Sequence, residues 1–273
     1  VFGFRMGMAG AALATIIGQF VSCLLAMYYL SHCKTVTVQA RHLRLHKKYV
    51  SRVASLGAAP CSNQLAMMVV QLVMNKSLTY YGGQSNYGEE VPLACAGIIS
   101  KVNQVYFSFI IGLSQGLQPI ISFNYGAGKY GRAKKAFLTS AAVGFVISTE
   151  AFVLYQAGPR QIIEVFGEGS EEYIAFSVSY FRVFLFFTFL NFLQPLTSNC
   201  FTAIGKPLKG MFLSLTRQII FLLPLIVALP LAVGIDGILY AGPVADGMAA
   251  AVSFVFIARE LAGKKYREDA AVA

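Results

Sequence analysis

Residues 112–135 read GLSQGLQPIISFNYGAGKYGRAKK and contain the spacing G-x-G-x-x-G over residues 126–131. That spacing is a signature of dinucleotide-binding turns, which follow a short strand and open a helix. The preceding run, residues 93–123, holds 31 residues and one charge, so it is too long to be a strand. A P-loop is excluded as well, because Lys129 is followed by Tyr130 and not by Ser or Thr. The glycines therefore predict a turn between two apolar segments.

The composition indicates an integral membrane protein. Hydrophobic residues make up 56% of the chain and charged residues 12%, whereas a soluble domain has about 25% charged residues. So few charges cannot cover a surface that faces water. The net charge of +10 therefore points to membrane orientation and not to a nucleic-acid partner, because cytoplasmic loops are rich in Lys and Arg.

The sequence carries no pattern typical of a metal centre or an enzyme. The five cysteines are scattered, none forms a C-x-x-C pair, and the three histidines fall in one basic segment. Cysteines inside apolar runs are most often small buried hydrophobes. No arrangement of a nucleophile with a base is present either. We therefore expect no metal, no cofactor and no enzymatic activity.

Seven segments are long and apolar enough to span a bilayer as helices of about 20 residues. A barrel is disfavoured, because no alternation with a period of two persists along them. The predicted fold class is all-α integral membrane, with one helix followed by a six-helix transmembrane bundle. The predicted spans are residues 6–30, 53–75, 93–123, 136–158, 173–201, 210–233 and 237–258.

The charges alternate between successive connections. Residues 31–52, 124–135, 203–209 and the tail from Arg259 hold fifteen of the 22 basic residues, before Arg52 at the edge is counted. The opposite connections are mainly acidic. An excess of Lys and Arg marks the cytoplasmic side, so we expect the Val1 end outside and the C-terminus in the cytoplasm of a multi-pass protein of the plasma (inner) membrane.

The basic linker after the first span suggests the domain organisation. It is the longest polar break, and it separates one helix from a group of six. The chain also enters an apolar segment almost at once, without an initiator Met. We therefore expect the C-terminal portion of a longer protein: a last helix of a missing bundle (residues 1–30), a cytoplasmic linker (31–52), a six-helix lobe (53–258) and a cytoplasmic tail (259–273).

Polar side chains recur at helical spacing on the second, third and fifth spans. Polar groups in membrane helices face protein or water and not lipid, so these stripes predict a shared polar substrate cavity. The alternative is that the amides only form hydrogen bonds between helices, which by itself stabilises a bundle. The candidate cavity residues are Gln64, Gln71, Asn75, Gln104, Ser108, Gln115, Thr188, Asn191, Gln194 and Ser198.

Four charges lie within the apolar spans and need partners. With a rise of about 1.5 Å per residue, Asp246 and Arg182 each lie roughly 14 Å from the outer end of their spans, and Lys101 lies roughly 12 Å from the outer end of its span. Glu150 lies in the outer half of its span. Arg182 is the expected mate of Asp246, because a guanidinium can bind a carboxylate through two parallel hydrogen bonds. Arg217 is close enough to the cytoplasmic edge to snorkel. Asp246 either couples proton movement to a rearrangement of the bundle or forms a structural ion pair that locks the last helix to it.

Several stretches resemble the multidrug and toxic compound extrusion (MATE) family, most closely its MepA-like branch. They are GLSQGLQPIISFNYGAGKYGRAKKAF (112–137), GMAGAALATIIGQ (7–19), FTAIGKPLKGMFLSLTRQIIFLLPL (201–225) and YAGPVADGMAAAVSF (240–254). The resemblance implies a two-lobe transporter of twelve helices, of which this chain is the sixth helix and the second lobe. It departs from the sodium-coupled NorM type, because spans 53–75 and 173–201 contain no Asp or Glu.

The resemblance implies a secondary transporter that exports amphipathic organic cations or drugs by antiport with protons or sodium ions. The expected partners are cationic small molecules, the coupling ion and the lipid bilayer, with a monomeric protein. One alternative is a flippase or exporter of lipid-linked sugars with the same two-lobe fold. Another is a membrane bundle without transport activity. The neutral amides of the stripes favour the first reading, since a flippase for pyrophosphate-linked sugars needs a cationic cavity.

Overall fold

The computed structural model describes residues 7–32, 46–85, 87–166 and 170–263, and within these ranges the chain is helical with short turns. It divides into two compact units, Val1–Leu56 and Gly57–Ala273. The predicted all-α class is confirmed. In the described part of the chain, six stretches are long and apolar enough to cross a membrane: Ala12–Tyr29, Glu90–Gly126, Tyr130–Ala157, Tyr173–Ala203, Pro207–Val233 and Ile235–Leu261.

The first unit consists mainly of helix α1 (Gly7–Ser31). Its large apolar side chains are exposed; Ile16 and Phe20, for example, each show more than half of their surface. A helix that exposes apolar groups in this way requires lipid or another apolar protein surface around it.

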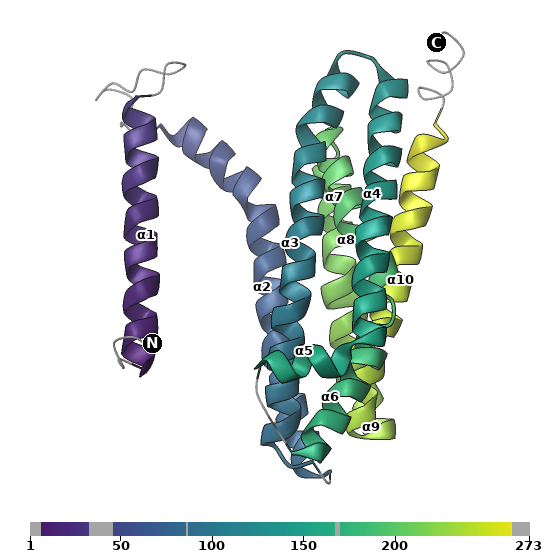
Figure 1. Ribbon diagram of the computed structural model, residues 1–273. Coiled ribbons are helices and arrows are strands. Elements are labelled where there is room, and N and C mark those ends of the chain that lie inside the picture. The colour runs from purple at the N-terminus through teal and green to yellow at the C-terminus, as the bar shows by residue number, and fades with distance from the viewer. Residues whose placement is uncertain (1–6, 33–45, 86, 167–169, 264–273) are drawn as a thin grey trace. The chain divides into compact units, whose positions relative to one another are not determined.

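The second unit is a helical bundle whose long helices run side by side (Figure 1). Its elements in chain order are α2 (Lys47–Gly83, which begins in the first unit), α3 (Glu90–Gly126), α4 (Tyr130–Ala157), α5 (Pro159–Phe166), α6 (Glu171–Phe184), the 3₁₀ turn η2 (Thr188–Leu190), α7 (Leu193–Ala203), α8 (Pro207–Leu215), the π-helical segment η3 (Thr216–Leu222), α9 (Leu223–Val233) and α10 (Ile235–Leu261).

Helix α2 contains the predicted span 53–75 but is absent from the six membrane-spanning candidates. Its amides Asn63, Gln64 and Gln71 lower the hydropathy of that stretch. Val70, Met74 and Leu78, spaced four residues apart, are buried in the common core. The packed face of the helix is therefore apolar, and its exposed side mixes amides with apolar side chains such as Leu65 and Met68.

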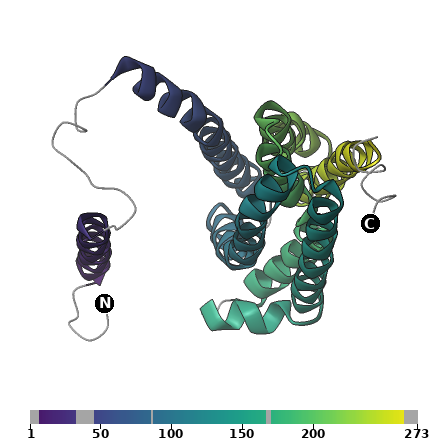
Figure 2. The same ribbon diagram turned by 90° about the horizontal axis from the view of Figure 1, so that it is seen from above.

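The core of the bundle is formed where α3, α4, α6, α7 and α10 pack together. Seen from above, α10 lies at the edge of the bundle beside the α7–α9 region (Figure 2). Tyr180, Phe181, Phe201 and Ile238 are among the side chains with almost no exposed surface. Aromatic side chains thus fill the space between α6, α7 and α10.

The glycine motif that opened the sequence ends a helix. Gly128 has φ of +75°, a conformation that glycine adopts at little cost. The amide of Lys129 donates to the carbonyl of Asn124 (2.9 Å) and that of Gly128 to Tyr125 (3.1 Å). This pair of bonds is the Schellman motif, which satisfies carbonyls at the end of a helix, so the predicted turn is present between α3 and α4.

The turn between α7 and α8 repeats this arrangement. Gly205 has φ of +81°, and the amides of Lys206 and Gly205 donate to Phe201 (2.9 Å) and Thr202 (3.1 Å). The Lys206 side chain then forms an ion pair with Glu260 near the end of α10. Both hairpins therefore close with the dipeptide Gly-Lys.

Two of the predicted continuous helices are interrupted. Span 173–201 is divided into α6 and α7 by a non-helical stretch that contains η2. Pro195 accounts for this, because a proline ring clashes with the carbonyl four residues earlier, here that of Asn191. Helix α7 therefore begins at Leu193, so that Pro195 falls in its first turn, where no amide hydrogen is needed. Span 210–233 is interrupted by the π-helical segment η3.

Candidate functional site

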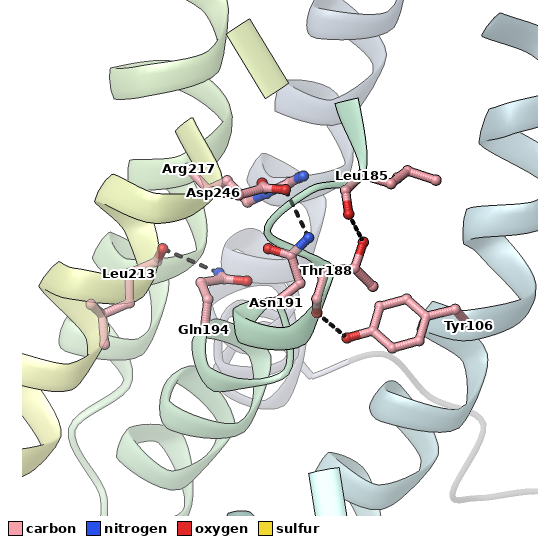
Figure 3. Close-up of polar contacts among 8 residues, drawn as sticks. All are labelled: Tyr106, Leu185, Thr188, Asn191, Gln194, Leu213, Arg217 and Asp246. Carbon is pink, nitrogen blue, oxygen red and sulfur yellow. Dashed lines mark hydrogen bonds and ion pairs between the residues drawn. The ribbon is translucent and has the colours of Figure 1, made fainter. Parts of the chain in front are cut away.

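The irregular segments of the bundle meet in its interior. Helix α10 packs against both the π segment η3 and the turn η2 between α6 and α7. Figure 3 shows their polar side chains converging: Asn191 comes from the interrupted span, Arg217 from η3 and Asp246 from α10. Interrupted helices and π turns are frequent at functional sites, so this buried polar network is the first candidate site.

Asp246 lies at the centre of the buried polar network and is 2% exposed. Its Oδ1 accepts a hydrogen bond from Arg217 Nε (2.6 Å), and its Oδ2 accepts one from Asn191 Nδ2 (2.7 Å). With a rise of about 1.5 Å per residue, Asp246 lies about 16 Å from the start of α10, and Arg217 lies about 15 Å from the start of the span formed by α8, η3 and α9. Both charges are therefore near the middle of their helices, where ionised groups must be paired.

The partner of Asp246 differs from the predicted one. Arg217 is held inside the bundle, with 13% of its side chain exposed, and its Cζ lies 6.0 Å from the centre of the Phe107 ring. The expectation that Arg217 snorkels was wrong. A π turn holds more residues than an α turn and changes the direction in which the following side chains point, and Arg217 lies in such a segment.

The other three charges predicted to be buried lie on the outside of this chain. Arg182, Lys101 and Glu150 are all exposed, and the backbone carbonyl of Arg182 accepts a bond from Gln156 (2.9 Å). Arg182 is therefore not the mate of Asp246. Depth along a helix is readable from the sequence, but the direction of a side chain depends on how that helix packs.

The carbonyls released by the interruption are satisfied by side chains. Thr188 Oγ1 donates to the carbonyl of Leu185 (2.7 Å), and Tyr106 Oη donates to the carbonyl of Thr188 (3.2 Å). The Tyr106 hydroxyl also lies 2.7 Å from Ser148 Oγ. The non-helical stretch is thus fixed between α3 and α4, as a buried break requires when no water is available.

Two further polar residues of the fifth predicted span, Gln194 and Ser198, also have protein partners. Gln194 Nε2 donates to the carbonyl of Leu213 (3.2 Å), and Ser198 Oγ donates to Gly210 (2.7 Å) and lies 3.1 Å from Ser214 Oγ. These bonds tie α7 to α8. Asn191, Gln194 and Ser198 thus bond to other helices, and the Thr188 side chain bonds locally to Leu185, while their place in a substrate cavity stays a prediction.

The candidate cavity residues on α2 and α3 have a different environment. Gln64, Gln71, Gln104, Ser108 and Gln115 are exposed and Asn75 is half-buried. Gln71 Nε2 donates to Asn75 Oδ1 (3.0 Å), and Ser108 Oγ donates to the carbonyl of Gln104 on its own helix (2.8 Å). We refer to these six residues of α2 and α3 together as the exposed amide face, which is the second candidate site.

Two residues of the exposed amide face line a pocket of about 480 Å³ on α2. Its lining contains Gln64 and Gln71, together with Cys61, Leu65, Met67 and Met68. Methionine side chains adapt to apolar ligands of different shapes, and amides offer neutral donors and acceptors. The pocket suits an amphipathic molecule, and its lining carries no formal charge.

Sequence reasoning missed three members of the buried polar network: Tyr106, Ser148 and Arg217. Arg217 could have been identified, because it is the one charged residue within residues 210–233 and ionisable groups inside a span are functional candidates. Ser148 carries no such signal, since its role depends on the neighbouring helix. In the described ranges no group of three His, Cys, Asp or Glu residues is placed to hold a metal ion.

Comparison with known proteins reveals extended similarity. The MatE family profile matches residues 61–228. The multidrug export protein MepA of Staphylococcus aureus (strain NCTC 8325 / PS 47) is 24% identical over 261 residues, which are 94% of this chain and 55% of the relative. MepA of Staphylococcus saprophyticus is 24% identical over 258 residues, with the same coverage. The chain thus spans about half the length of the curated relatives that it matches.

Solved structures share the fold. A MOP superfamily transporter from Pyrococcus furiosus superimposes with a TM-score of 0.79 at 19% identity, over 93% of this chain and 56% of that one. A MATE protein in its straight conformation gives 0.78 at 18% identity, over 94% and 57%. An outward-facing multidrug resistance MATE transporter gives 0.78 at 19% identity, over 93% and 56%.

Proposed function

The chain belongs to the MatE family, and on that premise we propose that it forms the second lobe of an exporter of amphipathic organic cations. The observation that carries the proposal is that the family match covers residues 61–228, most of the bundle that contains both candidate sites. The relatives named as multidrug export proteins support the same substrate class. Export is driven in this proposal by antiport with protons or sodium ions.

The proposed domain organisation follows the predicted boundaries. Residues 1–30 form the last helix of a first lobe, 31–52 a cytoplasmic linker, 53–258 the second lobe and 259–273 a cytoplasmic tail. Two observations support it: α1 exposes its apolar side chains, and the chain covers 55% of the length of its relatives. The Val1 end lies outside and the C-terminus inside, because most basic residues fall in the connections on the same side as the C-terminus. The transporter works as a monomer in the plasma membrane.

The exposed amide face is the proposed substrate surface. A cation that also carries apolar groups gains from neutral amides and thioethers without the cost of displacing a counter-ion. Gln64 and Gln71 supply the amides in the α2 pocket, beside Met67 and Met68. The buried polar network has no comparable free surface, since Asp246 and Asn191 are each at most 5% exposed.

A transport assay tests the assignment. Gln64→Leu with Gln71→Leu should reduce the uptake of ethidium into inverted vesicles several-fold, because both amides in the pocket are lost. Gln161→Leu is the matched control, since Gln161 is exposed on α5 and outside the pocket. Equal transport by the wild type and the double variant would refute the substrate surface. Loss in the control as well would show a non-specific effect.

For Asp246 we propose a structural role, in which its bonds to Arg217 and Asn191 hold α10 against the interrupted spans. The alternative is that Asp246 couples ion movement to transport. Asp246→Asn separates the two, because it keeps the shape and removes the charge. Transport with an unchanged dependence on pH and on sodium would exclude coupling by this residue. Loss of either dependence in a folded variant would overturn the structural assignment.

A further inference from the structure

A second pocket, the turn pocket, lies between the end of α3 and the start of α4, and none of its lining residues belongs to either candidate site. Its volume is about 330 Å³, at the lower end of the range for ligand pockets. Both helices border it close to the turn that contains Gly128. The lining residues are Leu117, Ile120, Arg132, Lys135, Ala136, Thr139 and Ser140.

The lining of the turn pocket is charged near the turn and uncharged farther from it. Arg132 lies about 3 Å from the start of α4 and Thr139 about 13 Å, from a rise of about 1.5 Å per residue. On the antiparallel helix, Leu117 lies about 13 Å from the end of α3. The cationic groups are therefore nearest the turn, and the hydroxyl groups of Thr139 and Ser140 lie at about the same depth as Leu117. A phospholipid is likewise charged at one end and uncharged beyond it.

The positive charge of the turn pocket is not balanced locally. The sequence from Val91 to Thr149, which covers nearly all of α3 and most of α4, contains no Asp or Glu. Within the described ranges, Arg132 and Lys135 form no ion pair, and both are exposed. Lys129 and Lys134 add further positive charge beside the pocket. The pocket is therefore complementary to an anion.

We propose that the turn pocket binds an anionic phospholipid of the surrounding leaflet. Arg132 and Lys135 bind the phosphate, since guanidinium groups bind phosphate oxygens through paired hydrogen bonds. Thr139 and Ser140 donate to the ester oxygens. The first part of an acyl chain lies on Leu117 and Ile120, the latter 52% exposed. The turn pocket has room for the headgroup and the first carbons of the acyl chains, and the rest of each acyl chain lies in the bilayer. Basic pockets between transmembrane helices bind anionic headgroups in this way.

Native mass spectrometry of the protein with phosphatidylglycerol or phosphatidylcholine tests the proposal. Phosphatidylglycerol should bind the wild type more tightly than phosphatidylcholine, which lacks net charge. Arg132→Gln with Lys135→Gln should weaken phosphatidylglycerol binding by about ten- to thirty-fold, since each basic residue near a headgroup contributes roughly tenfold or less. Thr139→Trp should weaken it as well, by filling the pocket without changing the charge.

The matched control is Lys209→Gln with Arg259→Gln, which removes two exposed charges outside the pocket lining. This variant should keep nearly all of its phosphatidylglycerol binding. Equal losses in both double variants would overturn the proposal in favour of diffuse attraction. Inorganic phosphate that competes at micromolar concentration would overturn it in favour of a site for free phosphate. An unchanged melting temperature in phosphatidylcholine shows that each variant is folded, and Thr139→Trp provides the test if the charge variant is not.

Discussion

The buried polar network and the exposed amide face contain the same kinds of side chain at the same helical spacing, yet they differ in environment. Asn191 and Ser198 are buried and bonded to other helices, whereas Gln71 and Ser108 are exposed and bonded within their own helix. A polar stripe thus identifies the face of a helix that avoids lipid, but the neighbouring helices decide whether that face holds the bundle together or remains open to a ligand.

The largest expected difference between the two regions concerns the ion pair. Arg217→Gln leaves the Asp246 carboxylate buried without its cation and should lower the free energy of unfolding by about 3–5 kcal/mol. The double variant Arg217→Gln with Asp246→Asn should recover a large part of this loss, because no charge then stays buried. Chemical denaturation in detergent micelles measures both. Additive losses would show that the two side chains act independently.

A packing substitution gives the next largest effect. A Cβ at Gly242 would lie 2.6 Å from Phe184 Cδ2, one helical turn from Asp246. Gly242→Ala should therefore cost about 1–3 kcal/mol through overpacking. On the exposed side of α3, Gly116 has no atom within 4 Å of such a Cβ, so Gly116→Ala should be neutral or stabilising by up to about 1 kcal/mol. Similar losses at both positions in thermal unfolding would contradict this contrast.

A pair of serines tests the hydrogen bonds directly. Ser198→Ala removes the bond to the Gly210 carbonyl and should destabilise the protein by about 1 kcal/mol. Ser108→Ala removes only a bond to its own helix and should change stability by less than about 0.5 kcal/mol. The same denaturation curves decide the outcome, and a larger loss at Ser108 would show that the exposed amide face is packed in the folded protein.

The smallest effect on stability is expected in the α2 pocket. Gln71→Leu loses one exposed bond to Asn75 and should leave the melting temperature within about 2 °C of the wild type, since surface substitutions rarely exceed ±0.5 kcal/mol. Measured beside the ethidium assay, this result would separate a substrate role from a structural one. A large fall in melting temperature would assign Gln71 to the packing of the bundle.

Much of the fold was predictable from the lengths of the apolar segments and from the residues at the turns. The membrane class, the apolar spans and the turn at Gly128 follow from local composition, because a helix in lipid must satisfy its own backbone. The sequence carried a local signal for the interruption before Pro195, because a proline ring inside a helix clashes with the carbonyl four residues earlier. The π segment at Thr216–Leu222 carried none that we identify, and its presence explains why Arg217 was placed wrongly.

The sequence by itself determined that Asp246 lies deep in an apolar helix and must find a partner, because an ionised carboxylate in lipid is costly. Only the tertiary structure decided that the partner is Arg217 and not Arg182. Depth along the helix favoured Arg182 as the partner, whereas the structure shows that the Arg182 side chain is exposed and the Arg217 side chain points into the bundle. That direction is set by the π turn and by how α6 and η3 pack against α10, which are interactions between segments far apart in the chain.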